Sequence, residues 1–188
     1  MSRYAPVELL RADHETSTFD CGSDQQTIWL GRYALIAQQA GTARVYVACR
    51  AGERKVAGFY SLAAGSILPE AASARLSAGA GRYPIPVVIL ARLGVDLAEQ
   101  GRGLGSALVR DALKRATTAA ATIGIRALLI HAESPSAAAF YRRVDPAFEP
   151  SPADPLHLVL LMKDIRAAIQ RAAAALAGEG RDTQVIDG

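Results

Sequence analysis

The chain has 188 residues, of which 51% are hydrophobic and 21% are charged. This length and composition exclude a disordered chain and suffice for one globular domain with a sizeable core. The formal net charge of +3 permits a polyanionic partner such as RNA or a nucleotide, but it does not require one.

The first predicted element is a helix over residues 23–40, where apolar side chains recur at helical spacing. Asp20 or Ser23 is expected to cap the start of this helix, because both residue types accept a hydrogen bond from a free backbone N–H. Gly41 is expected to end it.

Two stretches rich in β-forming residues follow, separated by a charged turn that contains glycine. They predict an antiparallel hairpin with strands over residues 44–49 and 56–62 and a turn over residues 50–55. The next segment, residues 63–86, is mixed in character. Within it we expect a short helix near residues 70–76, surrounded by loops rich in glycine and proline.

The stretch at residues 87–95 is apolar nearly throughout, which predicts a central strand buried on both faces. A Gly-rich turn follows it, and then an amphipathic helix over residues 106–122 that Gly124 ends. Residues 127–132 predict a second buried strand. Because a helix connects these two strands, we expect them to lie parallel to each other.

A further helix is predicted over residues 134–143, with Ser134 as its cap and Pro135 in its first turn. The remaining elements are a Pro-rich loop, a last strand, an Ala-rich helix and a frayed tail, expected at residues 146–155, 156–162, 163–176 and from Gly178 onward. This order of elements predicts an α/β fold built around a mixed sheet.

The most informative local feature is the sequence Gln100-Gly101-Arg102-Gly103-Leu104-Gly105, between the central strand and its helix. Glycines let backbone N–H groups approach an anion, and the helix adds unpaired donors and the positive end of its dipole. Gln100 and Arg102 could add side-chain donors. Ser106 excludes the dinucleotide fingerprint, and no Gly-Lys-Ser/Thr follows to make a Walker A loop. On spacing alone, a turn that merely joins a strand to a helix is the alternative.

Gln100, Gly103 and Gly105 match the pattern Gln/Arg-x-x-Gly-x-Gly, which resembles motif A of the GNAT N-acetyltransferase family. The preceding residues 93–96 are similar to the splayed strand whose free backbone groups pair with the pantetheine arm in that family. The resemblance implies an enzyme that uses acetyl-CoA as acetyl donor. It implies contacts with this cofactor from Leu93, Gly94, Val95, Gln100, Gly101, Arg102, Gly103, Leu104, Gly105 and Ser106.

The same resemblance implies a GNAT fold, with a mixed, mostly antiparallel central sheet flanked by helices. The acetyltransferase domain is expected over residues 1–164, and a C-terminal helix with a frayed tail is expected over residues 165–188.

Tyr141 ends the sequence Ala137-Ala138-Ala139-Phe140-Tyr141, which resembles the Ala-x-x-Phe-Tyr signature of GNAT motif B. In that family the tyrosine hydroxyl lies near the thioester sulfur. The resemblance therefore implies that Tyr141 is the catalytic general acid, which gives a proton to the departing thiolate, while Phe140 belongs to the core. A tyrosine packed at a helix end is the structural alternative.

The sequence after Tyr141 departs from the family, which commonly continues as Phe-Tyr-x-x-x-Gly-Phe. Two residues look inserted around Asp145 and Pro146, and Ala147 stands in place of the glycine. The turn into the next strand is therefore expected to differ.

Four segments narrow the resemblance to one GNAT subgroup, the TacT-like toxins of type II toxin–antitoxin modules. They are residues 19–22, 83–86, 90–96 and 148–152, and the similarity covers residues 7–164. It implies acetylation of the α-amino group of aminoacyl-tRNA, which blocks translation. It also implies a small ribbon-helix-helix antitoxin as partner and a homodimer.

A dedicated general base is not obvious from the sequence. The α-amino group of an aminoacyl ester has a pKa of about 8 or below, so much of it is neutral at cellular pH. His131 and Glu133, at the end of a buried strand, are the nearest candidates, and polar strand-end residues are the equal alternative.

Basic residues are expected near the mouth of the cleft, where they would neutralise tRNA phosphates. They are Arg82, Arg92 and Arg142, with Arg143 beside them. The alternatives to a tRNA substrate are a small amine or a protein N-terminus, or a degenerate domain that only binds. Intact Gln100, Gly103, Gly105 and Tyr141 argue against the degenerate domain.

Cys21 and Cys49 are the two cysteines, and neither belongs to a C-x-x-C pair or to a cluster with histidine. We therefore expect no disulfide framework and no metal site, and we expect both thiols to be buried or half-buried. No apolar stretch is long enough to cross a bilayer, and residues 1–6 lack the apolar core of a signal peptide. A cytoplasmic protein without membrane contact is the expectation.

Overall fold

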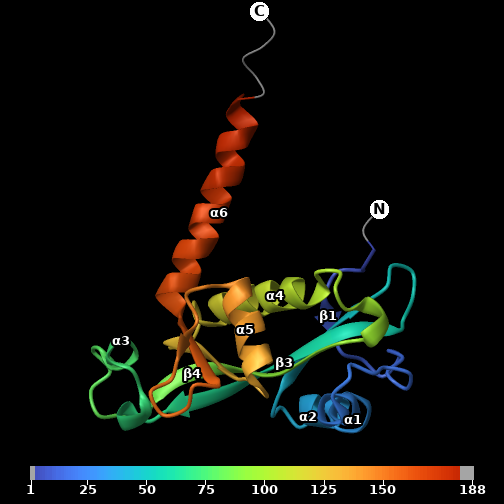
Figure 1. The fold of residues 1–188 in the computed structure, drawn as a ribbon, viewed down its shortest axis with the longest axis horizontal. Helices are drawn as coiled ribbons and strands as arrows, with labels where there is room; N and C mark the ends of the chain where they lie inside the picture. Colours follow the sequence, from blue (N-terminus) through green and yellow to red (C-terminus); the bar gives the residue numbers. More distant parts are fainter. Residues whose placement is uncertain (1–2, 183–188) are drawn as a thin grey trace, which may run out of the picture.

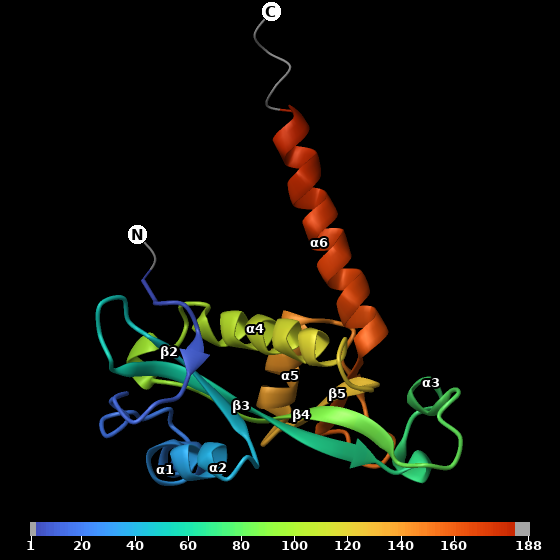
Figure 2. The same ribbon diagram turned by 180° about the vertical axis from the view of Figure 1, so that it is seen from behind.

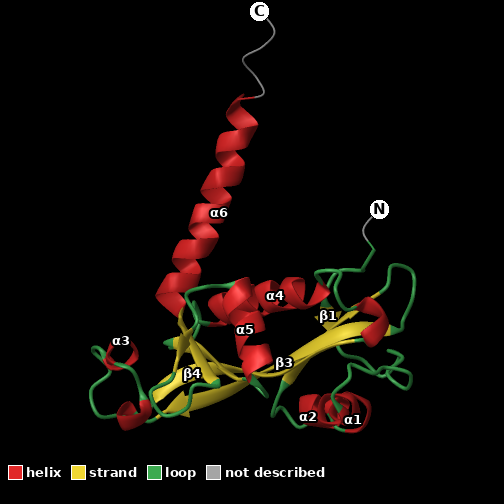
Figure 3. Cartoon of the chain, in the orientation of Figure 1, coloured by secondary structure: helices red, strands yellow, loops and turns green. Residues whose placement is uncertain are grey.

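The computed structural model describes residues 3–182, which form one sheet with helices on both faces (Figures 1 and 3). The strands are β1 (Glu8–Leu9), β2 (Arg44–Cys49), β3 (Val56–Ile67), β4 (Ile85–Val95), β5 (Ala127–His131), β6 (Glu149–Pro150) and β7 (His157–Leu161). The helices are α1 (Asp24–Arg32), α2 (Ala34–Gln39), α3 (Ala74–Ser77), α4 (Leu104–Ala119), α5 (Pro135–Val144) and α6 (Met162–Asp182), with short 3-10 turns η1 (Pro69–Ala71) and η2 (Leu97–Glu99).

The seven strands lie in the order β1-β2-β3-β4-β5-β7-β6. All neighbours are antiparallel except β4 and β5, which run parallel and are connected by α4. The predicted mixed, mostly antiparallel sheet is therefore confirmed, as is the parallel pair around the crossover helix.

The helices divide between the two faces of the sheet (Figures 1 and 2). One face is covered by α4, α5 and the base of α6, which share the largest apolar core with side chains of β3, β4, β5 and β7. The other face carries α1 and α2 over β2 and β3, and α3 over the opposite half of the sheet.

The predicted helix over residues 23–40 is in fact two helices, which correct that prediction. Ser23 caps α1 as expected, and Gly41 adopts a φ of 74° after α2. Between the helices Tyr33 has a φ of −117°, which turns the chain. Because both helices pack on the same apolar cluster, the apolar spacing runs through the break and could not reveal it.

The C-terminal helix is longer than predicted. It runs to Asp182, beyond residue 176 and beyond Gly178, where fraying was expected, and the rest of the predicted tail, residues 183–188, lies outside the described residues. Met162 and Ile165 bury its base in the core, and the remainder projects away from the sheet (Figures 1 and 2). A high content of alanine explains why helix persists without packing along its whole length.

Smaller differences concern short elements. The two-residue strands β1 and β6 were not predicted, because two residues are too few to show alternation. The helix expected near residues 70–76 is instead η1 followed by α3.

Cys21 is half-buried and Cys49 is buried, and both are free thiols, as predicted. Within residues 3–182 no helix is long and apolar enough to cross a bilayer.

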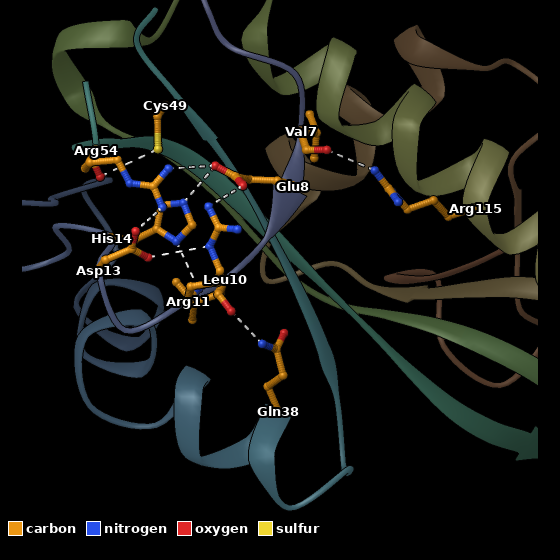
Figure 4. A network of polar contacts seen from close by, with 10 residues as sticks. All are labelled: Val7, Glu8, Leu10, Arg11, Asp13, His14, Gln38, Cys49, Arg54 and Arg115. Atoms are coloured by element: carbon orange, nitrogen blue, oxygen red, sulfur yellow. Dashed lines mark hydrogen bonds and ion pairs between the residues drawn. The ribbon is translucent and has the colours of Figure 1, made fainter. Parts of the chain in front are cut away.

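Polar contacts fasten the N-terminal segment to the sheet (Figure 4). The Glu8 carboxylate lies 3.2 Å from Nε2 of His14 and accepts a hydrogen bond from Arg54 at 3.0 Å. Gln38 of α2 donates to the backbone carbonyl of Leu10 at 2.6 Å. These contacts fix the chain that leads toward the start of α1, next to the site described below.

Candidate active site

Strands β4 and β5 separate in the middle of the sheet. Their pairing ends at Leu90 and Ile130, whereas β4 stays paired with β3 as far as Val95. A register shift in the β3–β4 pairing, opposite Leu90 and Arg92, marks the point of divergence. The last residues of β4 therefore present backbone groups without a strand partner on the β5 side, and an extended ligand could pair with them.

A cleft of about 610 Å³ opens beside this free edge of β4. Its walls are the end of β4, the loop before α4, the start of α1, Glu133 after β5, and two side chains of α5. The predicted cofactor residues that line it are Leu93, Gly94, Val95, Gln100, Gly101, Gly103, Leu104, Gly105 and Ser106. Arg102 was predicted with them but does not line the cleft; its guanidinium lies 3.9 Å from Glu99.

The Gly-rich loop has the backbone that an anion site needs. Gly101 and Gly103 adopt φ values of 72° and 82°, and a Cβ on either would meet no atom within 4 Å. Gly103 is the N-cap of α4 and offers no side-chain cap, while the first helical bond runs from Ala107 to Gly103. The N–H groups of residues 104–106 are therefore without helical partners and can donate hydrogen bonds to a phosphate at the positive end of the helix dipole.

Two other glycines are explained by close packing. A Cβ on Gly94 would lie 2.7 Å from the ring of Phe59 and 3.2 Å from Sγ of Cys21. A Cβ on Gly105 would lie 3.3 Å from the ring of Phe140. These positions bring β4, α4 and α5 close together at the cleft, whatever the cleft binds.

The Gln100 side chain is engaged within the protein. Its amide nitrogen donates to the backbone carbonyls of Cys21 at 3.1 Å and Val95 at 3.0 Å. It therefore ties the loop to β4 and to the segment before α1. This corrects the expectation that Gln100 supplies a side-chain donor to an anion.

A buried carboxylate, Glu99, organises the outer side of the loop and was not singled out from the sequence. Its side chain is 2% exposed and accepts hydrogen bonds from Tyr4 at 2.7 Å, Arg3 at 3.1 Å and Arg50 at 2.6 Å. The hydrogen bond from Tyr4, helped by those from the two arginines, outweighs burial and lowers the pKa of Glu99 to about 2. The partners come from distant segments, so no local spacing could have indicated them.

The depressed pKa of Glu99 makes stability depend on pH. An ordinary glutamate has a pKa of about 4.3, so the stabilisation is complete above that value and is lost as the pH falls toward 2. We expect Glu99→Gln to lower the free energy of unfolding by about 2 kcal/mol at pH 7. Urea denaturation should show this difference shrinking below pH 4. An equal difference at pH 3 and pH 7 would contradict the assignment.

Tyr141 lies in α5 with its ring 5.2 Å from Phe140 and 6.2 Å from Phe148, centroid to centroid. The side chain is buried, and this burial, with the nearby Glu133 carboxylate, raises the pKa of the Tyr141 hydroxyl. Among residues 3–182 the hydroxyl has no hydrogen-bond partner. Tyr141 is therefore protonated at neutral pH, but unlike its neighbour Phe140 it is not among the residues that line the cleft.

The turn after α5 is the segment where the sequence departs from the family pattern. Asp145 accepts a hydrogen bond from the backbone N–H of Ala147 at 2.9 Å, which makes a local Asx turn. No residue other than glycine has a positive φ in the described part of the chain, so Ala147 needs no glycine conformation. Phe148 is still buried and packs near Tyr141.

Only one of the two candidate bases lies in the cleft. Glu133 lines it and accepts hydrogen bonds from Gln26 and from Ser23, the latter at 3.4 Å. His131 instead stacks on His157 with ring centroids 4.0 Å apart, and burial together with His157 lowers the pKa of its imidazole. The contacts of Gln26 and Ser23 were not predicted, because over 100 residues separate them from Glu133.

The predicted basic residues do not form one cluster. The guanidinium of Arg92, on β4, lies 5.4 Å from the ring centroid of Trp29 in α1. Arg142 is exposed in the last turn of α5, and Arg143 lines the cleft. Arg82 is not at the cleft mouth: it precedes the first residue of β4, roughly 30 Å along that strand from its cleft end.

Known proteins are similar to this chain in sequence and in fold. A model of the acetyltransferase (GNAT) family matches residues 7–145. A tRNA-acetylating toxin of Mycobacterium tuberculosis is 48% identical over 170 residues, which cover 90% of this chain and 99% of that protein.

Two solved structures are also similar. AtaT complexed with acetyl-methionyl-tRNAfMet has 27% identity and a TM-score of 0.79, covering 88% of this chain and 99% of that one. A mutant AtaT bound to the C-terminus of the antitoxin AtaR and to acetyl-CoA has 27% identity and a TM-score of 0.76, covering 89% and 99%.

Proposed function

The chain belongs to the acetyltransferase (GNAT) family, and from that premise we propose that it transfers the acetyl group of acetyl-CoA to the α-amino group of aminoacyl-tRNA. The observation that carries this proposal is the 48% identity to a tRNA-acetylating toxin over 90% of the chain. Acetylation at that position would block translation, so the protein would act as a toxin.

The cleft supports the proposal by its fit to acetyl-CoA, which supplies an acetyl group activated as a thioester. The free edge of β4 at residues 93–95 suits an extended pantetheine arm, and residues 101–106 offer backbone N–H groups to a pyrophosphate. The Tyr141 hydroxyl, protonated and without a hydrogen-bond partner among residues 3–182, would give its proton to the departing sulfur.

The remaining assignments are parts of the same proposal. We propose that Arg92 and Arg142, which lie near the cleft, and Arg82 at the far end of β4 contact tRNA phosphates. We also propose that the protein forms a homodimer, binds a small ribbon-helix-helix antitoxin and is cytoplasmic, as expected for a toxin of this class. Residues 1–164 would form the acetyltransferase domain, and residues 165–188 an appended helix and tail.

Incubation with radiolabelled acetyl-CoA and total charged tRNA tests the function. We expect label on the aminoacyl group, released after nuclease digestion as acetyl-aminoacyl adenosine, and no label on the same tRNA after deacylation. Transfer should weaken as salt rises, because phosphate contacts release counterions. If charged tRNA stays unlabelled while a small amine or a protein N-terminus is acetylated, the proposed substrate is wrong.

A further inference from the structure

A buried side chain in the cleft wall has an unused hydrogen-bond acceptor. Gln26, in the first turn of α1, is 6% exposed and lines the cleft. Its amide nitrogen donates to Oε1 of Glu133, while its Oε1 has no partner among residues 3–182. This orientation of the amide is fixed chemically, because a carboxylate only accepts hydrogen bonds. Buried polar atoms are nearly always paired, so a ligand is expected to supply the missing donor.

The Glu133 carboxylate adds further acceptor capacity beside that oxygen. It accepts one hydrogen bond from Gln26 and one from Ser23, and two carboxylate oxygens can accept about four. Glu133 is exposed to the cleft, two residues after the end of β5. The pair therefore bridges α1 and β5 where β4 and β5 have diverged. The Glu133 charge also contributes, after burial, to the raised pKa of the Tyr141 hydroxyl, the proposed proton donor.

We propose that Gln26 and Glu133 form the subsite for the acceptor amino group, with N–H donors of the amine directed to Oε1 of Gln26 and to the Glu133 carboxylate. This inference rests on the proposed function and assigns the residues that make the enzyme selective for an amine over a hydroxyl as nucleophile. A neutral primary amine can donate two hydrogen bonds and keep its lone pair for attack. A hydroxyl has one donor and would leave an acceptor unpaired.

The step balances with these groups in place. The amine lone pair forms the new C–N bond as the C–S bond breaks. The sulfur takes the Tyr141 proton, and the proton that leaves the nitrogen returns to Tyr141 through solvent. Glu133 and Gln26 are positioning residues in this step, since they orient the amine and do not react.

The test compares the wild-type enzyme with Gln26→Met and Glu133→Gln. Gln25→Met is the matched control, because it makes the same change one residue earlier at an exposed position. Acceptors are charged tRNA and, as a tRNA-free probe, a set of amino-acid amides. Calorimetry gives the affinity for acetyl-CoA. Inhibition by tRNA whose aminoacyl group has been deaminated to a hydroxyacyl group measures discrimination between amine and hydroxyl.

We expect both variants to lower kcat/KM at least about tenfold with either acceptor and to reduce discrimination against hydroxyacyl-tRNA. The affinity for acetyl-CoA and all properties of the Gln25→Met control should stay within twofold. Glu133→Gln, at an exposed position, keeps the test valid if Gln26→Met fails to fold. Activity and discrimination unchanged in Glu133→Gln would overturn the subsite.

The tRNA-free probe separates this inference from the proposed function. If wild-type enzyme acetylates the amides but not charged tRNA, the proposed substrate is wrong. The subsite then stands or falls with the kcat/KM of the two variants for the amides. If it acetylates charged tRNA and the variants behave as wild type, only the subsite fails. If it acetylates neither acceptor, both are overturned.

Discussion

Tyr141→Phe is expected to lower kcat for acetyl transfer by at least about 100-fold while leaving acetyl-CoA affinity within twofold. The substitution removes one oxygen and keeps the ring that packs between Phe140 and Phe148. It removes the only proton that the side chain can give to the departing sulfur. Because burial raises the pKa of Tyr141, its ionisation should not produce a falling limb of the pH–rate profile below pH 10.

Tyr46→Phe is the matched control for this change. Tyr46 is half-buried on β2, where it stacks on Tyr60 and lies under Arg115, away from the cleft. Its variant should keep full activity, measured as thiol release from acetyl-CoA in the presence of acceptor. A Tyr141→Phe enzyme that retained more than a tenth of the wild-type rate would remove Tyr141 as the general acid.

The parts of the site that were predictable are contiguous in the sequence. The loop at residues 100–105 could be predicted as an anion site, because its glycines and the start of the following helix are adjacent in the sequence. The same holds for Phe140 and Tyr141 at the end of a short helix with an obvious cap. Local pattern was enough for both, and the parallel crossover between β4 and β5 then brought the loop and Phe140 to one cleft, with Tyr141 buried next to Phe140 in the chain and not in the cleft lining.

The parts that escaped prediction depend on tertiary contacts. The Glu99 cluster joins the N-terminal segment to the hairpin turn and the loop, and the Gln26–Glu133 contact spans 107 positions. The apolar run at residues 87–95 predicted a strand buried on both faces. Val87, Val88 and Leu90 in its first half are buried, whereas Arg92, Leu93 and Val95, beyond the last pair with β5, are half-buried. The free edge arises from a register shift, and hydrophobicity does not encode that shift. Arg82 was misplaced because proximity in sequence to β4 says nothing about which end of the strand faces the cleft.

Gly103→Ala is expected to weaken acetyl-CoA binding at least about tenfold. Gly103 has a φ of 82°, a conformation that costs an L-residue about 1 kcal/mol or more. The strain alone would shift the N–H groups that begin α4. The new methyl group would also stand in open space beside the loop, where the pyrophosphate is proposed to lie. Calorimetric titration with acetyl-CoA measures the effect directly.

A matched variant at a second glycine separates a general loss of stability from a local effect on the loop. Gly52, in the turn between β2 and β3, has a φ of 81° and equally open space around its missing Cβ, but it does not line the cleft. Gly52→Ala should therefore lower the melting temperature about as much as Gly103→Ala and leave acetyl-CoA affinity within twofold. If the two variants lose affinity equally, a general loss of stability, and not a change at the loop, explains the loss. If neither loses affinity, the anion is bound elsewhere, and the role proposed for residues 101–106 fails with it.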